Sequence, residues 1–122
     1  MLTVSLIIID QLSKFLFERH FQALVSYNTG VAFGIPIPWF VSFTIGVLAL
    51  AFIYYLKRIE NLRITWYLQL FIAGTIGNMI DRIWHNHVID FINIGFWPSF
   101  NLADSYLTIA VIYIVFYHLK VD

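Results

Sequence analysis

The sequence predicts an all-α integral membrane protein with four transmembrane helices and a small extracytoplasmic β element. Of the 122 residues, 61% are hydrophobic and 11% are charged, and the mean hydropathy is +0.81. A soluble domain has about a quarter of its residues charged, so this composition is typical of a chain that lies in lipid. Four spans of ~20 residues each occupy most of the length, which predicts a single domain over residues 1–122.

The charge balance and the cysteine count exclude several classes of function. The formal net charge is zero, which does not favour nucleic acid as a partner. The sequence contains no cysteine, which excludes disulfides, thiolate nucleophiles and Cys-ligated metals. No obligatory protein partner is predicted, and membrane lipids are the expected surroundings.

The predicted spans are residues 2–17, 39–56, 64–82 and 101–119. The first is expected to be a retained span and not a removed signal peptide, because polar residues lie in its middle. Within it, Asp10 and Lys14 are four residues apart with the acid on the N-terminal side, the favoured orientation for a helical ion pair. This pair either neutralises two charges locally in lipid or braces a site that other helices contribute.

The connections between the spans indicate their orientation. The loop Lys57–Arg63 carries three basic residues, and short loops rich in Lys and Arg stay in the cytoplasm. Both termini are then cytoplasmic, and the connections 18–38 and 84–99 lie outside. In the first of these, Asn28 and Gly30 are typical of a turn, and its prolines exclude a helix interior. We therefore expect a small extended or hairpin element there, on the membrane surface.

Three of the seven acidic residues, Asp81, Asp90 and Asp104, lie between Gly74 and Asp104. Ionisable groups at membrane depth are costly and usually mark a functional site. Asp90 and Asp104 stand at the outer ends of their segments, so the topology predicts that they share one depth. Two carboxyl groups that share a site hold one proton between them. The ionised group can then activate a water molecule while the protonated one polarises a carbonyl group, as in aspartic proteases.

Other interpretations of these residues remain open at this level. Asn101 followed by Asp104 resembles a capping box, so capping alone could explain Asp104. His85 and His87 could join Asp90 in a metal site, although an interfacial loop accounts for these histidines better.

Two further classes of function compete with a peptidase. The first is a small membrane transporter or proton-relay protein that uses the same acidic residues. The second is a non-catalytic membrane scaffold, which would need none of these carboxyl groups.

Five short blocks follow one another along the chain: DQLSK at 10–14, NTGVAF at 28–33, GNMIDR at 77–82, VIDF at 88–91 and FNLAD at 100–104. Together and in this order they resemble the lipoprotein signal peptidase family, signal peptidase II. The resemblance implies a multi-pass aspartic endopeptidase of the bacterial inner membrane with its active site toward the outer face. Such enzymes remove the signal peptide of diacylglyceryl-modified prolipoproteins before the lipidated cysteine, and they require no metal or organic cofactor.

The resemblance also implies roles for individual residues. Asp90 and Asp104 correspond to the catalytic dyad. The residues that line or support the substrate site are Asn28, Gly30, Asn78, Arg82 and Asn101, with Asp10 and Lys14 bracing it from the first helix. For Arg82 we favour a structural role beside Asp81 over contact with the substrate backbone. The small sheet of the family corresponds to the regions 27–33 and 87–94.

The chain departs from the family pattern in one outer connection. Between Phe33 and Trp39 it has only the residues 34–38, where relatives usually carry a longer segment with a surface helix over the active site. The resemblance therefore does not carry a lid over to this chain.

Overall fold

The computed structural model describes residues 2–28, 31–32, 35–36, 39–59, 61 and 63–121. The helices are α1 (Leu2–His20), α2 (Trp39–Ile59), α3 (Trp66–His85) and α4 (Leu102–Val121). Each begins within two residues of the predicted span and ends two or three residues after it. The predicted spans stop where the apolar run stops, whereas the helical hydrogen bonds continue into the polar residues that follow.

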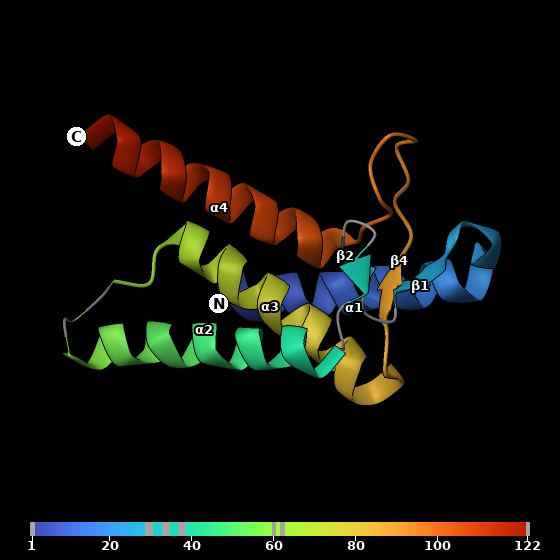
Figure 1. Cartoon of the computed structure of the whole chain (residues 1–122), viewed down its shortest axis with the longest axis horizontal. Helices are drawn as coiled ribbons and strands as arrows, with labels where there is room; N and C mark the ends of the chain where they lie inside the picture. Colours follow the sequence, from blue (N-terminus) through green and yellow to red (C-terminus); the bar gives the residue numbers. More distant parts are fainter. Residues whose placement is uncertain are drawn as a thin grey trace.

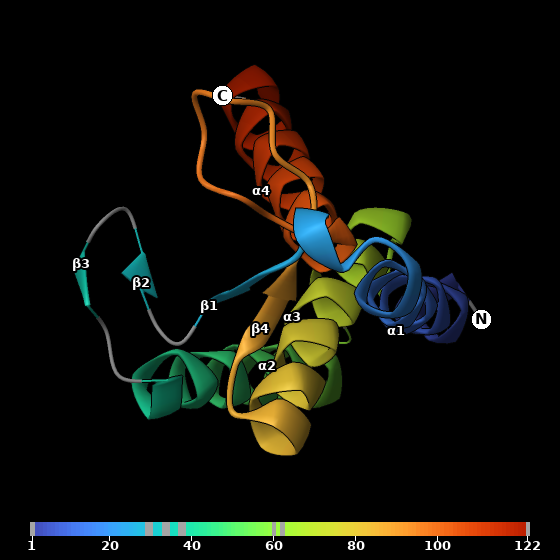
Figure 2. The ribbon, with the colours of Figure 1, turned by 90° about the vertical axis from the view of Figure 1, so that its right-hand side faces the viewer.

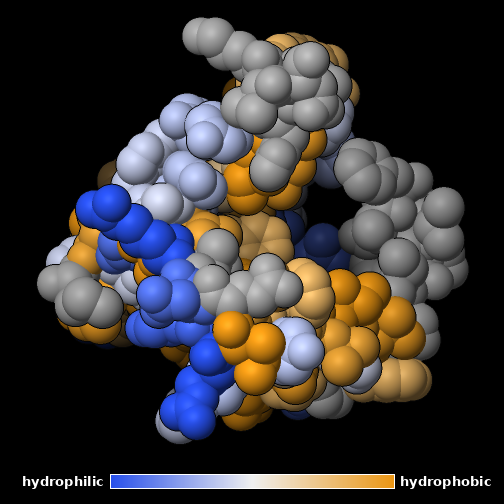
Figure 3. Space-filling model, turned by 90° about the vertical axis from the view of Figure 1, so that its left-hand side faces the viewer, coloured by the Kyte–Doolittle hydropathy of each residue, from blue (hydrophilic) through white to orange (hydrophobic). Residues whose placement is uncertain are grey.

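The helices alternate in direction along the chain (Figure 1). The N-terminus, the α2–α3 connection and the C-terminus lie toward one end of the molecule, and the strands and the loop before α4 lie toward the other. Figure 3 looks onto the first of these ends, where hydrophilic residues gather beside apolar ones. Lys57 and Arg58, in the last turn of α2, belong to this end.

Helix α3 is the centre of the bundle and packs mainly against α4 and α1. Glycine permits the close approach to α4, because a Cβ atom on Gly74 would lie 2.5 Å from the carbonyl oxygen of Ala103. Small residues at helix contacts are the usual solution in membrane proteins, where association depends on close packing.

Large polar side chains lie in the interior of the protein, and large apolar side chains lie on its surface. The largest fully buried side chains are those of Lys14, Asn101, Asp10 and Asp81, whereas long series of Leu, Ile, Val and Phe side chains on α1, α2 and α4 are exposed. Among the described residues, Phe40–Ile59 is the helix that is long and apolar enough to cross a membrane by composition alone, and Leu102–Tyr117 is a shorter apolar helix. Charged residues lower the hydropathy of α1 and α3, but three of these six residues, Asp10, Lys14 and Asp81, are buried.

Two short antiparallel ribbons lie at the end of the bundle opposite to the α2–α3 connection (Figure 1), and Figure 2 looks onto this end. β1 (Ser26–Asn28) follows the 3₁₀ turn Gln22–Leu24 and pairs with β4 (Val88–Asp90), with Ser26 opposite Asp90. β2 (Val31–Ala32) pairs with β3 (Ile35–Pro36). Of the shortened connection 34–38, only β3 falls within the described residues.

The segment between α3 and α4 determines where Asp90 lies. Asn86 caps the C-terminal end of α3: it has a left-handed backbone (φ 60°), and its N–H donates to the carbonyl oxygen of Arg82. Asparagine is one of the few residues that adopt this conformation readily. After β4 an isolated bridge joins Ile92 to Phe100. Because this bridge closes the loop at its base, the end of β4 lies beside the start of α4.

We expect Gly74→Ala to destabilise the protein by about 1–3 kcal/mol, the usual cost of overpacking. The added methyl group would meet a backbone carbonyl oxygen, which cannot move without shifting α4. The matched control is Gly46→Ala on α2, whose methyl group would meet side chains and no backbone atom, with Met79 Sδ at 3.1 Å and Thr75 Cγ2 at 3.2 Å. Thermal unfolding of both variants in the same detergent should lower the melting temperature clearly for Gly74→Ala alone. Equal melting temperatures would contradict this account of the α3–α4 contact.

Candidate active site

Two asparagine side chains connect the carboxyl groups of Asp90 and Asp104. Asn101 Nδ2 donates to Asp90 Oδ1 at 3.0 Å and to Asn78 Oδ1 at 3.1 Å. Asn78 Nδ2 in turn donates to Asp104 Oδ1 at 2.9 Å. The chain of contacts therefore runs from β4 through the start of α4 and α3 to the first turn of α4. Both amides are buried, so their hydrogen bonds determine their orientation.

Asp104 caps its helix and also joins this network. Its backbone N–H donates to Asn101 Oδ1 at 2.8 Å, and its Oδ2 accepts the N–H of Asn101 at 3.2 Å. This reciprocal pair is the predicted capping box. Each carboxylate oxygen has two lone pairs, so the cap and the bond from Asn78 leave Asp104 able to accept a further proton. Capping and acid–base chemistry are compatible at this residue.

The surroundings of Asp90 favour its protonated form. The residue is 3% exposed, and burial, with a further contribution from the charge of Asp104, raises its pKa to about 7. The charge of Lys14 and hydrogen bonds from Asn101 and Asn28 partly offset this rise. A carboxyl group with such a pKa is half protonated near neutral pH and can act as a proton donor.

Two of the predicted support residues, Asn28 and Gly30, belong to the connection between α1 and α2. Asn28 ends β1, lies opposite Val88 of β4 and hydrogen-bonds to Asp90. It therefore contacts Asp90 from the ribbon. Gly30 lies outside the described residues.

Asp10 and Lys14 form the predicted ion pair, with Lys14 Nζ 2.7 Å from Asp10 Oδ2. The pair also has partners on other elements, because Lys14 Nζ lies 2.9 Å from Asp81 Oδ2 and Asp10 Oδ1 accepts the N–H of Ala103. Both interpretations of this pair therefore apply. The two charges neutralise each other, and the two side chains also bind to α3 and to the start of α4.

Sequence reasoning placed Asp81 near the site but gave it no part in it. The structure gives Asp81 contacts to α1 through Gln11 and Lys14 and to β4 through Ile89. The sequence signal for it was its position inside the GNMIDR block, one helical turn after Asn78.

Arg82 lines a cavity of about 440 Å³ between α2, α3 and α4, together with Asn78 and Asp104. Its charge interacts most strongly with Asp104 and less with Asp81. Asp81 has its ion pair with Lys14, and within the described part of the chain no ion pair joins Asp81 to Arg82. A second cavity of about 410 Å³ lies between α4 and the loop that carries Phe96 and Trp97, and it also reaches Asp104.

The two histidines considered as metal ligands contact aromatic rings. The His87 ring lies 5.8 Å from that of His85 and 4.6 Å from that of Tyr27. In the described part of the chain, no group of three or more His, Asp or Glu side chains is arranged to hold a metal ion.

Comparisons with known proteins agree over nearly the whole chain. The family model described as signal peptidase (SPase) II matches residues 2–120. The chain belongs to the signal peptidase II family. A lipoprotein signal peptidase of Dehalococcoides mccartyi is 36% identical over 141 residues, covering 95% of this chain and 88% of the relative. A lipoprotein signal peptidase of Burkholderia vietnamiensis is 37% identical over 145 residues, covering 98% of this chain and 87% of the relative.

The fold has a solved relative as well. A structure described as a bacterial membrane enzyme superposes with a TM-score of 0.81 at 30% identity, covering 98% of this chain and 85% of that one. The predicted family is thus confirmed, together with a mostly helical membrane protein as the fold class.

Asp104→Asn should lower the pKa of Asp90 from about 7, because it removes a neighbouring negative charge that raises this pKa. Burial remains, so the pKa should stay above its ordinary value of 3.8. The protonation midpoint can be measured from the ¹³C shift of the Asp90 carboxyl group in protein labelled at aspartate. Glu18→Gln is the control, since Glu18 contacts Tyr27 and not the network. An unchanged midpoint in Asp104→Asn would show that the two carboxyl groups do not interact.

Proposed function

We propose that this protein removes the signal peptide from diacylglyceryl-modified prolipoproteins and cuts before the lipidated cysteine, with Asp90 and Asp104 as the catalytic dyad. The family and its consistently named relatives support the peptidase activity. The observation that carries the assignment of the dyad is the hydrogen-bonded link from Asp90 through Asn101 and Asn78 to Asp104, at the meeting point of two cavities.

The two carboxyl groups have different roles in this proposal. Asp104 is the ionised base, because its oxygens accept hydrogen bonds from Asn78 and Asn101 and it stands at the positive end of α4. Asp90 is the acid, because burial keeps its pKa near 7. Asp104 takes a proton from a water molecule as the water oxygen attacks the scissile carbonyl carbon, while Asp90 donates to the carbonyl oxygen. The tetrahedral intermediate then collapses: the C–N bond breaks, the leaving amine takes a proton from Asp104, and Asp90 takes back its proton from the hydroxyl oxygen as the C=O bond re-forms.

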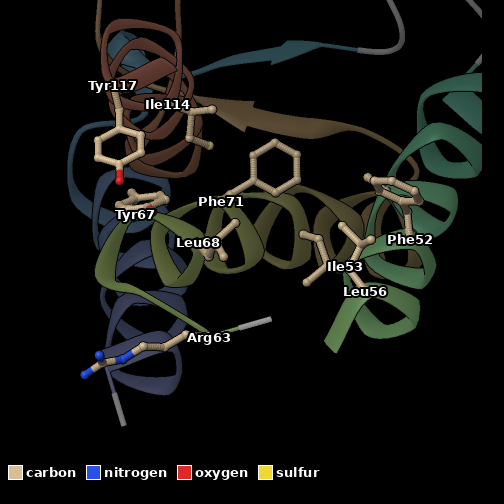
Figure 4. Close-up of a pocket in the computed structure, with 10 residues that line it drawn as sticks. Phe52, Ile53, Leu56, Arg63, Tyr67, Leu68, Phe71, Ile114 and Tyr117 are labelled. Atoms are coloured by element: carbon tan, nitrogen blue, oxygen red, sulfur yellow. The ribbon is translucent and has the colours of Figure 1, made fainter. Parts of the chain in front are cut away.

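The cavities suggest where the substrate binds. The cavity that Arg82 lines shares Ala49 and Phe71 with a third cavity of about 420 Å³. Together these two cavities form an apolar groove along α2, α3 and α4 toward Arg63. Figure 4 shows Phe71 and Leu68 of α3 beside Ile53 and Leu56 of α2 in this groove. We assign the groove to the apolar segment of the signal peptide.

We assign the second cavity, between α4 and the loop with Phe96 and Trp97, to the diacylglyceryl chains. Each CH₂ group buried there would contribute ~0.8 kcal/mol to binding. This arrangement puts the peptide bond beside Asp104, where the two cavities meet.

In the membrane, we propose that all four helices span the bilayer as one domain over residues 1–122. The basic α2–α3 connection would be cytoplasmic, with both termini on that side and the β1–β4 ribbon and dyad at the outer face. This orientation is supported by Figure 1, in which both termini and the α2–α3 connection lie toward one end of the molecule and the strands lie toward the other.

The transporter alternative needs acidic residues spread through the depth of the membrane. Asp10 and Asp81 are instead joined by Lys14, and Asn78 links this group to Asp104. This clustering at one end of the bundle favours a single reaction site over a relay.

Purified protein should cleave a diacylglyceryl-modified prolipoprotein and leave the unmodified form intact, because the lipid chains supply much of the binding. The measurement is product formation for both substrates side by side, followed by mass spectrometry of the new N-terminus. Equal cleavage of both forms would contradict the assigned lipid subsite, and flux of protons into vesicles without cleavage would favour the transporter.

Asp90→Asn and Asp104→Asn should each lower the rate of cleavage by about 10³-fold or more, since each removes a group that acts jointly with the other. Asparagine keeps the size of the side chain and its acceptor oxygen, so the protein should still fold and insert. Glu18→Gln changes an acid outside the network and should cleave at the normal rate. Substantial cleavage by either Asn variant would refute the dyad.

A further inference from the structure

We infer that Asp10 and Asp81, bridged by Lys14, are positioning residues that set the separation of the Asp90 and Asp104 carboxyl groups. The inference rests on the proposed function, because it assigns a role relative to that dyad. It concerns three buried side chains that need not touch the substrate: Asp10, Lys14 and Asp81 are 0%, 1% and 0% exposed.

Each of the two buried carboxylates holds the residue immediately before a dyad aspartate. Asp10 Oδ1 accepts the backbone N–H of Ala103 at 2.8 Å, and Ala103 precedes Asp104. Asp81 Oδ2 accepts the backbone N–H of Ile89 at 3.1 Å, and Ile89 precedes Asp90. The two halves of the dyad are thus attached in the same way to two different acids.

The two acids are in turn held at a constant distance from each other. Lys14 Nζ lies 2.7 Å from Asp10 Oδ2 and 2.9 Å from Asp81 Oδ2. Gln11 Nε2 makes a second bridge, because it donates to Asp10 Oδ2 at 3.2 Å and to Asp81 Oδ1 at 3.1 Å. Both bridging side chains stand on α1, which supplies neither aspartate of the dyad.

These contacts form a continuous clamp from one half of the dyad to the other: Ala103, Asp10, Lys14, Asp81 and Ile89. Buried charges of opposite sign resist separation, because each would be left without a partner in an apolar surrounding. Asp10 also packs closely against α3, since a Cβ atom on Gly77 would lie 2.5 Å from Asp10 Oδ2. A shift of Lys14 or of either acid therefore moves one dyad carboxyl group relative to the other.

A positioning role predicts a loss in kcat without a loss in substrate binding. The groove and the second cavity are lined by other residues, so KM for the lipidated substrate should stay within about two-fold. Misplacement of reacting groups by ~1 Å can cost about 10²-fold in rate. We expect Asp81→Ala to lower kcat by about 10²-fold, because Ile89 loses its acceptor.

Two further variants separate the parts of the clamp. Asp81→Asn keeps an oxygen that can accept the N–H of Ile89, and it should recover at least about 10-fold of the kcat lost in Asp81→Ala. Lys14→Met combined with Asp81→Asn removes one charge of each sign and therefore leaves the net charge of the clamp unchanged. This double variant should lose about 10²-fold in kcat, because the charged bridge is gone.

The control is Tyr106→Phe, which breaks a different contact between α1 and α4. The Tyr106 hydroxyl donates to the carbonyl oxygen of Leu6 at 3.1 Å. It lies in the field of the Asp10 charge, but among the described residues it makes no hydrogen bond to the clamp, and phenylalanine leaves the charge of the clamp unchanged. It should lower the melting temperature and leave kcat unchanged. All variants are assayed for kcat, KM and melting temperature in the same detergent, on the lipidated prolipoprotein.

The outcomes distinguish the inference from the proposed function. Absence of cleavage by the wild-type protein would refute the proposed function itself. If the wild-type protein cleaves, three results would overturn the inference: the clamp variants keep their kcat, Asp81→Asn and Asp81→Ala lose the same amount of kcat, or Tyr106→Phe loses as much kcat as the clamp variants. If Asp81→Ala or the double variant does not accumulate in the cell, Asp81→Asn and Gln11→Leu test the inference in their place. A several-fold lower kcat at constant KM in these two variants supports the clamp, and an unchanged kcat overturns it.

Discussion

The ion pairs of Lys14 with Asp10 and Asp81 are the interaction on which the rest of the structure depends. A buried pair contributes little net stability, because desolvation offsets the attraction, but removal of one partner typically costs about 3–5 kcal/mol. Such pairs tolerate little change in geometry. In this protein they join α1 to α3, and through Ala103 and Ile89 they reach α4 and β4. One cation therefore relates four elements of the chain.

The distribution of polarity explains how a bundle of this kind holds together. Its exposed surface is rich in large apolar side chains, whereas the fully buried large side chains are polar or charged. Lipid removes the hydrophobic gain from helix association, so close packing and interhelical hydrogen bonds must drive it. The approach of Gly74 to Ala103 supplies the packing. Asn78 and Asn101 supply hydrogen bonds that also reach the carboxyl groups of Asp104 and Asp90.

Much of the fold and part of the candidate site were predictable from local patterns. The apolar runs indicated every helix, and the Asp10–Lys14 spacing and the Asn101–Asp104 spacing predicted contacts that the structure contains. The partner of Asp81 was not predictable in this way. The sequence favoured a structural role for Arg82 beside Asp81, but the ion pair of Asp81 is with Lys14 on α1. Contacts between segments far apart in the sequence leave no periodic signal.

The sequence by itself determined the membrane class, the helices and the family, because these follow from composition, from apolar run length and from motifs read along the chain. Only the tertiary structure decided that two amides link Asp90 to Asp104 and that two other acids hold the residues before them. The physical reason is that a hydrogen bond depends on distances of about 3 Å. Such distances between α1, α3, β4 and α4 exist only after the helices pack.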